Sequence, residues 1–232
     1  MDDQSIRPTV QQIESQYSIL NERFYGGELP KPVITVFSDS KRKGILGWCT
    51  IQKMWKTGKN PTAAELQGMS SDELQAYADE GFYEINICAE YLTRPIDEVC
   101  ETILHEMVHL YNAEHGIEDT SRNGYYHNKR YKETASAHGL IVEKTKKYGY
   151  SQTSLSEEAK QFIQKQNFAD LTLCRKGMMI PKVKNDEEQG EAAEKKKTGS
   201  RKYVCPVCGD IVRATKAVRI GCLNCNAEMI ET

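Results

Sequence analysis

The sequence lacks a long apolar run and a strong excess of charge of either sign. Its 232 residues include 31 basic and 33 acidic side chains, which give a formal net charge of −2. This near balance argues against a strongly basic nucleic-acid-binding protein, although a local basic cluster is compatible with it. A membrane-spanning helix needs about 20 consecutive apolar residues. No such run occurs in the sequence, so we expect no association with a membrane.

The first residues also lack the features of an export signal. Residues 1–8 are polar and contain two acids, whereas a signal peptide has a basic start and an apolar centre. Eight cysteines would suit a disulfide-rich secreted protein, but four of them form two Cys-x-x-Cys pairs, which favour metal binding. We therefore expect a cytoplasmic protein, with room for one sizeable core and a small second module.

The most informative stretch is residues 102–111, which read TILHEMVHLY. On a helix, His105 and His109 project from the same face because they are four residues apart. Glu106 lies beside that face, where it could reach a water held by a metal ion. The flanking residues are apolar, and burying three ionisable side chains without a partner would be costly. The HExxH pattern therefore predicts two zinc ligands and a general base.

A catalytic zinc site normally has three protein ligands, and three other histidines compete for the third place. His115 has the metzincin spacing from His109, with Asn112 where that family has glycine, but a continuing helix would carry it out of reach. His127 follows a glycine-containing loop that could return the chain to the metal, and we favour it. His138 fits a capping or surface role better.

Periodicity and turn residues indicate an α+β fold. The patterns predict helices near 9–24, 71–78, 96–114, 131–139 and 155–168, and strands near 33–37, 45–51, 82–88 and 171–174. Residues 53–81 resemble an insertion. The helix that carries the HExxH pattern is expected to be capped by Asp97 or a neighbour and to end at Gly116.

The C-terminal part changes in composition. Residues 182–201 are rich in Lys, Glu, Gly and Ala and predict a flexible linker. In 202–232, two Cys-x-x-Cys pairs are separated by thirteen residues, a spacing typical of a zinc ribbon rather than of a redox pair. The predicted structural zinc ligands are Cys205, Cys208, Cys222 and Cys225. The remaining cysteines, expected to be buried thiols, are Cys49, Cys88, Cys100 and Cys174.

Several of these segments resemble the SprT-like zinc metallopeptidases, a family that includes the Spartan proteases acting on DNA–protein crosslinks. The similarity covers most of residues 9–140. It is carried by LNERFYGGELP at 20–30, GWC at 47–49, INI at 85–87, LHEMVH at 104–109 and YHN at 126–128. The resemblance implies His127 as the third zinc ligand. Asn128 stands where the family often has glycine, and residues 53–81 are additional.

The resulting hypothesis is a zinc endopeptidase with three parts. A zincin-like α+β domain with a small mixed sheet would occupy 1–181, followed by the linker and the ribbon. One catalytic and one structural Zn²⁺ are expected, with a peptide substrate and Glu106 as general base. An oxyanion stabiliser could come from Tyr125, Tyr126 or Tyr131, although aromatic packing is the favoured explanation for any single one of them. DNA is a candidate partner of the ribbon. The alternatives are a non-catalytic zinc-binding adaptor and a nucleic-acid-binding protein.

Overall fold

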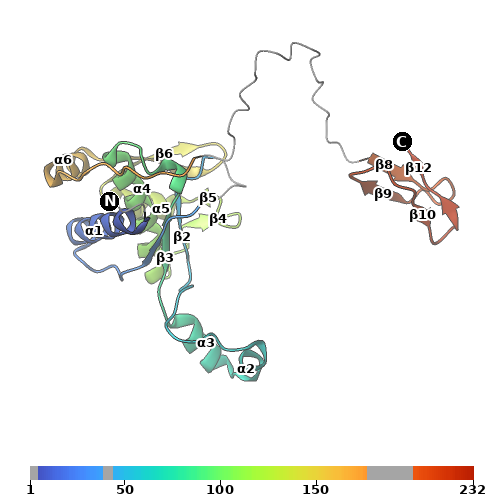
Figure 1. Ribbon diagram of the computed structural model, residues 1–232, viewed down its shortest axis with the longest axis horizontal. Coiled ribbons are helices and arrows are strands. Elements are labelled where there is room, and N and C mark those ends of the chain that lie inside the picture. The colour runs from blue at the N-terminus through green and yellow to red at the C-terminus, as the bar shows by residue number, and fades with distance from the viewer. Residues whose placement is uncertain (1–4, 39–43, 177–200) are drawn as a thin grey trace, which may run out of the picture. The chain divides into compact units, whose positions relative to one another are not determined.

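The computed structural model describes residues 5–38, 44–176 and 201–232. The chain forms two compact units, 1–180 and 181–232. Except for Arg201, the linker predicted at 182–201 lies outside the described residues. The first unit combines helices with two small sheets, which confirms the α+β class (Figure 1).

The first unit opens with α1 (Arg7–Tyr25), the helix expected over 9–24. Pro8 lies in its first turn, where its missing N–H leaves no hydrogen bond unmade. Ile13 and Leu20, on one face, are completely buried. Gly26 ends the helix in the left-handed conformation, with φ of 61°.

The first sheet has three strands, β1 (Val33–Thr35), β2 (Gly47–Cys49) and β3 (Glu84–Ile87), in the order β1-β3-β2. All three were predicted, with longer bounds. β3 pairs in parallel with β1 and antiparallel with β2. Ile85 and Ile87 are completely buried, since β3 is the central strand. A short 3₁₀ helix, η1 (Ala89–Tyr91), follows.

The central helix of the unit is α4 (Ile96–Glu114), which has the predicted bounds. It packs against α1, β2, β3 and α5. Its N-terminus differs in part from the prediction: Pro95 occupies the N-cap position without a side-chain cap, and the N–H of Ile96 donates to Oδ1 of Asp170 at 3.2 Å. Asp97 accepts from the N–H of Glu98 at 3.0 Å, so the first turn is capped both by this expected residue and by Asp170, which is distant in sequence. After Glu114 the chain turns at Gly116, with φ of 64°.

A second sheet, which the sequence did not predict, covers residues 120–155. Its strands are β4 (Thr120–Ser121), β5 (Tyr126–His127), β6 (Leu140–Thr145) and β7 (Gly149–Leu155), in the order β4-β5-β7-β6. Helix α5 (Lys129–Ala137) lies between β5 and β6, and Asn128 caps it by accepting from two backbone N–H groups. Helix α6 (Glu157–Gln166) follows β7.

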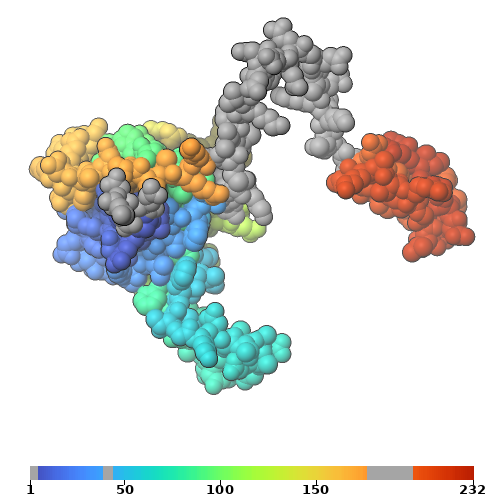
Figure 2. Space-filling view, viewed as in Figure 1, coloured from blue at the N-terminus to red at the C-terminus, as the bar shows by residue number. Residues whose placement is uncertain are grey.

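Residues 53–81 form an arm that extends from the body of the first unit (Figures 1 and 2). It contains α2 (Ala63–Gly68) and α3 (Ser71–Asp79), neither of which has a buried residue. Each helix is stabilised at its start by a capping box. A pair of hydrogen bonds between Trp55 and Phe82 closes the base of the arm.

The strand expected at residues 171–174 is not found, and two of the four cysteines expected to be buried are not fully buried. The segment forms no strand, and its neighbour Arg175 instead donates its N–H to the carbonyl oxygen of Ala89 at 3.0 Å. Leu171 is buried in the core, which explains the apolar pattern. Cys174 is exposed, and Cys49 is half-buried, whereas Cys88 and Cys100 are buried as expected.

The second unit contains two small antiparallel sheets. Its strands are β8 (Arg201–Val204), β9 (Ile211–Ala214), β10 (Gly221–Cys222), β11 (Ala227–Glu228) and β12 (Ile230–Glu231). One sheet has the order β12-β8-β9, and β10 pairs with β11 in the other. Among the described residues of this unit, the buried apolar cluster consists of Tyr203, Cys205, Cys222 and Met229. A core this small needs a further source of stability.

Candidate metal centre

Three imidazole rings converge in the first unit. Nε2 of His127 lies 3.2 Å from Nε2 of His105 and 3.0 Å from Nε2 of His109. His105 and His109 project from adjacent turns of α4, and His127 comes from β5. Two nitrogens bound to one tetrahedral zinc at about 2.0–2.1 Å would be about 3.3 Å apart. The spacing of the rings therefore suits a zinc ion.

The loop between α4 and β5 brings His127 to the helix. Gly124 and the two residues before it adopt positive φ angles of 54°, 56° and 83°, which reverse the chain between β4 and β5. The N–H of His127 then donates to the carbonyl oxygen of Tyr148 at 3.0 Å, and His127 pairs with Gly149 of β7. The position of His127 is thus fixed by the second sheet.

His109 is oriented by Asp119, a residue that sequence reasoning missed. Nδ1 of His109 donates to Oδ2 of Asp119 at 2.7 Å. The same oxygen accepts from the side-chain amide of Asn112 at 2.9 Å, and Asp119 is buried. Because a carboxylate can only accept, the proton of His109 lies on Nδ1 and its Nε2 lone pair faces the other two rings.

His105 is oriented by a relay through a hydroxyl. Thr153 of β7 donates to Oε1 of Glu101 at 3.0 Å. Its oxygen therefore accepts from Nδ1 of His105, 3.3 Å away. Nε2 of His105 consequently also carries a lone pair toward the centre. Sequence reasoning missed Thr153 as well, because nothing local links it to His105.

The surroundings shift the pKa values of the three histidines in different directions. Burial, together with the neighbouring His109 and His127, lowers the pKa of His105 well below its usual value. Burial and the proximity of His109 lower the pKa of His127 to about 4. Burial also opposes the charged form of His109, but the hydrogen bond and charge of Asp119, with Glu106, raise its pKa overall. A metal ion binds the neutral form of imidazole, which is the form that burial favours at His105 and His127. The three residues fit a metal ion.

Glu106 lies beside the three rings and is buried. Burial raises the pKa of its carboxyl group to about 7. The absence of a side chain at Gly47 makes room for it: a Cβ there would lie 3.2 Å from Oε1 of Glu106 and 2.7 Å from the carbonyl oxygen of Asn86. β2 thus packs directly against the carboxylate.

A cleft of about 710 Å³ opens at this centre. One wall is formed by residues 44–49 and 51 around β2, and the other by Tyr148 and residues 151–153 of β7. All three histidines and Glu106 line it. A molecule in the cleft would therefore reach the metal-binding atoms and the carboxylate together.

The other two histidines lie outside the cluster. His115 is exposed, and its Nδ1 lies 2.8 Å from the carbonyl oxygen of Tyr111, one helical turn earlier. His138 contacts the carbonyl oxygen of Phe24 at 2.7 Å and stacks on the ring of Tyr25. Neither imidazole belongs to the group of converging ligand atoms.

The three tyrosines considered for oxyanion stabilisation have different environments. Tyr131 is buried, and its ring centroid lies 4.6–5.0 Å from those of the three histidines, so it packs under the cluster. Tyr126 packs on Gly149. Tyr125 is exposed and lines the cleft.

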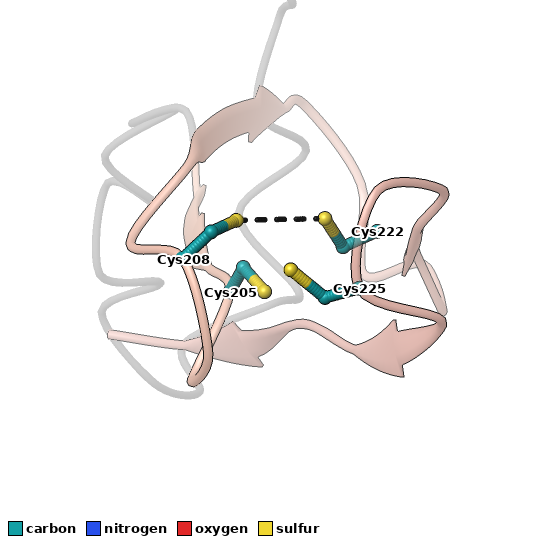
Figure 3. A group of neighbouring side chains, drawn as sticks. All are labelled: Cys205, Cys208, Cys222 and Cys225. Carbon is teal, nitrogen blue, oxygen red and sulfur yellow. Dashed lines mark hydrogen bonds between the residues drawn. The ribbon is translucent and has the colours of Figure 1, made fainter.

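Four cysteines form a second group in the C-terminal unit (Figure 3). The sulfur atoms of Cys205, Cys208, Cys222 and Cys225 all lie within 4.8 Å of one another. Those of Cys208 and Cys222 are 3.6 Å apart, close to the about 3.8 Å expected for two thiolates on a tetrahedral zinc with bonds of about 2.3 Å. Hydrogen bonds from the backbone N–H groups of Cys208 and Val207 lower the pKa of the Cys205 thiol to about 7. The cluster could form a zinc ribbon.

Of the comparisons with known proteins, the one with protein-family models gives a match. No curated protein and no solved structure matches the chain significantly. Among the described residues, no helix combines the length and apolar character needed to cross a membrane. The model of the SprT-like family matches residues 13–148, which include all three converging histidines and Glu106. Because this match covers more than half of the sequence, the chain belongs to the SprT-like family.

Proposed function

We propose that the protein is a zinc-dependent endopeptidase in which His105, His109 and His127 hold the catalytic metal. The observation that carries this proposal is the convergence of three imidazole Nε2 atoms beside the buried Glu106 in an open cleft. Three neutral imidazoles are a ligand set of catalytic zinc and leave a fourth position open. A structural site would not need an adjacent carboxylate.

In this mechanism Glu106 is the general base. When bound, zinc supplies Lewis acidity and lowers the pKa of a water molecule to about 7. The carboxylate of Glu106 accepts the proton of the attacking water and later delivers it to the leaving amine. Burial raises the pKa of this carboxyl group, and a bound cation would favour its charged form, which is the form that accepts the proton. Asp119 and Thr153 hold two of the rings in the tautomer that directs Nε2 inward.

Among the described residues, no strand pairs with the edge of β2 that faces away from β3, which favours an extended peptide as the substrate. The residues that flank β2 form backbone hydrogen bonds: the carbonyl oxygen of Leu46 accepts from Cys88, which follows β3, and the N–H of Thr50 donates to Glu84 of β3. Because hydrogen-bonded pairs alternate along an antiparallel ladder, the backbone groups of Gly47 and Cys49 point away from β3. Both residues line the cleft. A peptide could therefore add to this edge as a further strand.

The remaining parts of the hypothesis are consistent with this role. We infer a zincin-like domain over 1–181, a linker over 182–201 and a ribbon over 202–232 that holds a structural zinc through four cysteines. The family resemblance makes DNA-associated proteins candidate substrates and DNA a candidate partner. A cytoplasmic location stays a prediction from the sequence.

The test is hydrolysis of a quenched fluorescent peptide by the full chain, with Glu106→Gln as the control. The variant should keep its zinc, measured by metal analysis, and lose about 10²–10⁴-fold in kcat, the usual contribution of a general base. If Glu106→Gln cleaves as fast as the wild-type protein, Glu106 is not the base. A non-catalytic adaptor would hold zinc and leave the peptide intact.

A further inference from the structure

Two neighbouring turns beside His127 concentrate positive charge. Residues 120–150 contain seven basic and two acidic side chains, whereas the whole chain has a net charge of −2. Five of these cations lie next to tyrosine rings or at the turn between β6 and β7. We call them the basic rim: Arg122, Lys132, Lys144, Lys146 and Lys147, all of which are exposed.

One end of the basic rim adjoins the candidate metal centre. The turn after β4 lies next to the turn before β7, because β5 pairs with β7 and Tyr126 packs on Gly149. The carbonyl oxygen of Tyr148 accepts from the N–H of His127. Tyr148 also lines the cleft. A substrate that leaves the cleft past Tyr148 therefore comes close to Lys147, which lies on the ring of Tyr148.

Aromatic rings hold several of the cations in place. The guanidinium of Arg122 lies 5.0 Å from the ring centre of Tyr126, and Nζ of Lys147 lies 4.8 Å from that of Tyr148. Two ammonium groups, from Lys132 and Lys144, lie 5.4 and 5.5 Å from the single ring of Tyr150. Among the described residues, none of the five forms an ion pair with a carboxylate. Their mutual repulsion would be relieved by an anionic ligand.

The tyrosine rings of the basic rim help to decide whether it suits a nucleic acid or an acidic peptide. Proteins that bind single-stranded nucleic acid without sequence preference combine a basic groove with aromatic rings on which bases stack. Here Tyr126, Tyr148 and Tyr150 each already carry a cation of the protein itself. Tyr126 also packs on Gly149. Tyr148 keeps 42% of its surface exposed, but each of the three rings already has a cation beside it. Charge is therefore the main feature that the basic rim offers a ligand, and it suits the carboxylate side chains of an acidic segment.

We propose that the basic rim binds an acidic segment of the substrate, next to the bond that is cleaved. This inference rests on the proposed endopeptidase function and adds a preference for peptides with Asp or Glu on one side of the scissile bond. Exposed ion pairs of this kind are individually weak and are screened by salt. Three or four together should give a preference of about three- to tenfold in kcat/KM at low salt.

The test uses three quenched peptides that share one central sequence. One carries three glutamates on the N-terminal side, the second carries them on the C-terminal side, and the third has glutamines at all these positions. We expect one acidic peptide to be cleaved about three- to tenfold more efficiently than the neutral one, with the preference decreasing in 0.5 M salt. Equal cleavage of all three peptides would overturn the inference and leave the proposed function intact.

Two double variants test whether the basic rim, rather than positive charge elsewhere on the protein, causes the preference for acidic peptides. The double variant Lys144→Gln/Lys147→Gln should lose most of the preference and cleave the neutral peptide as the wild-type protein does. The matched control, Lys160→Gln/Lys165→Gln on α6, should keep the preference. If both double variants behave alike, the cations of the basic rim are not responsible.

Binding provides a readout that does not depend on cleavage. Zinc-loaded full chain with Glu106→Gln should bind the preferred acidic peptide about three- to tenfold more tightly than the neutral one by fluorescence anisotropy. This measurement decides the inference even if no peptide is hydrolysed, an outcome that would count against the proposed function alone. If a single-stranded oligonucleotide of equal charge binds more tightly and displaces the peptide, the occupant is nucleic acid and the inference fails.

Discussion

The hydroxyl group of Thr153 connects Glu101 to His105: it lies 3.0 Å from the carboxylate and 3.3 Å from Nδ1 of the imidazole. Glu101 and His105 are one turn apart on α4, whereas Thr153 comes from β7. The three imidazoles therefore differ in their support. His109 has a direct carboxylate partner, His105 has one through a hydroxyl, and Nδ1 of His127 is buried without a partner among the described residues.

Replacing Thr153 by valine should weaken zinc binding at the candidate metal centre. Valine has a similar shape but cannot accept the proton of His105 Nδ1, so the ring is free to rotate or to change tautomer. Loss of such a supporting hydrogen bond typically costs 10–100-fold in metal affinity, and we expect about tenfold here. Competition with a chromophoric chelator measures the affinity. Thr153→Ser keeps the hydroxyl and should bind zinc nearly as the wild-type protein does; equal weakening in both variants would count against the relay.

Replacing Asp119 by alanine should have a larger effect. His109 would lose its charged partner, and the buried amide of Asn112 would lose its acceptor. We expect about 100-fold weaker zinc binding and a loss of about 1–3 kcal/mol in the free energy of unfolding. Chelator competition and denaturant unfolding measure the two effects. The exposed neighbour Glu118 serves as control, because Glu118→Ala removes a nearby acid that is not part of the pair. Similar results for the two variants would contradict the role of Asp119.

The convergence of the three histidines could be predicted largely because two of them belong to a local pattern. A four-residue spacing on a helix places two histidines together, and the bounds of α4 followed from its apolar periodicity. His127 could be favoured over His115 because a continuing helix carries His115 away from the helix face on which His105 and His109 lie. The converging rings agree with that choice geometrically.

The supporting residues could not be predicted, because their contacts depend on strand pairing between distant segments. β7 has the sequence GYSQTSL, in which few side chains are aliphatic, so the alternation that indicates a strand is weak. Without β7, nothing places Thr153 near His105. Asp170 is similar, because its contact with the start of α4 spans 74 residues. The wrong strand at 171–174 arose because Leu171 is buried by packing without belonging to a sheet.

Replacing Gly47 by alanine should impair catalysis without removing the metal. The new Cβ would lie 2.7 Å from the carbonyl oxygen of Asn86 and 3.2 Å from Oε1 of Glu106. Either β2 or the carboxylate must move, at a cost of about 1–3 kcal/mol. We expect a decrease in kcat of at least about tenfold, since Glu106 must be well positioned, with zinc content unchanged.

The control for Gly47→Ala is Gly68→Ala in the arm, where an added Cβ meets no atom within 4 Å. That variant should keep its full activity. Loss of zinc together with activity in Gly47→Ala would show that the substitution disturbs the whole centre rather than the carboxylate.

Metal analysis should find two zinc ions in the full chain and one zinc ion in a variant of the ribbon. Cys205→Ser/Cys222→Ser removes two of the four sulfur ligands, and the small apolar cluster around Tyr203 and Met229 cannot stabilise the ribbon alone. We therefore expect the C-terminal unit to become sensitive to protease, while the first unit, which has its own core, keeps its zinc and its peptidase activity. Cys174→Ser, at an exposed cysteine outside the cluster, should retain both ions. Two ions in the double variant would mean that these cysteines do not bind zinc.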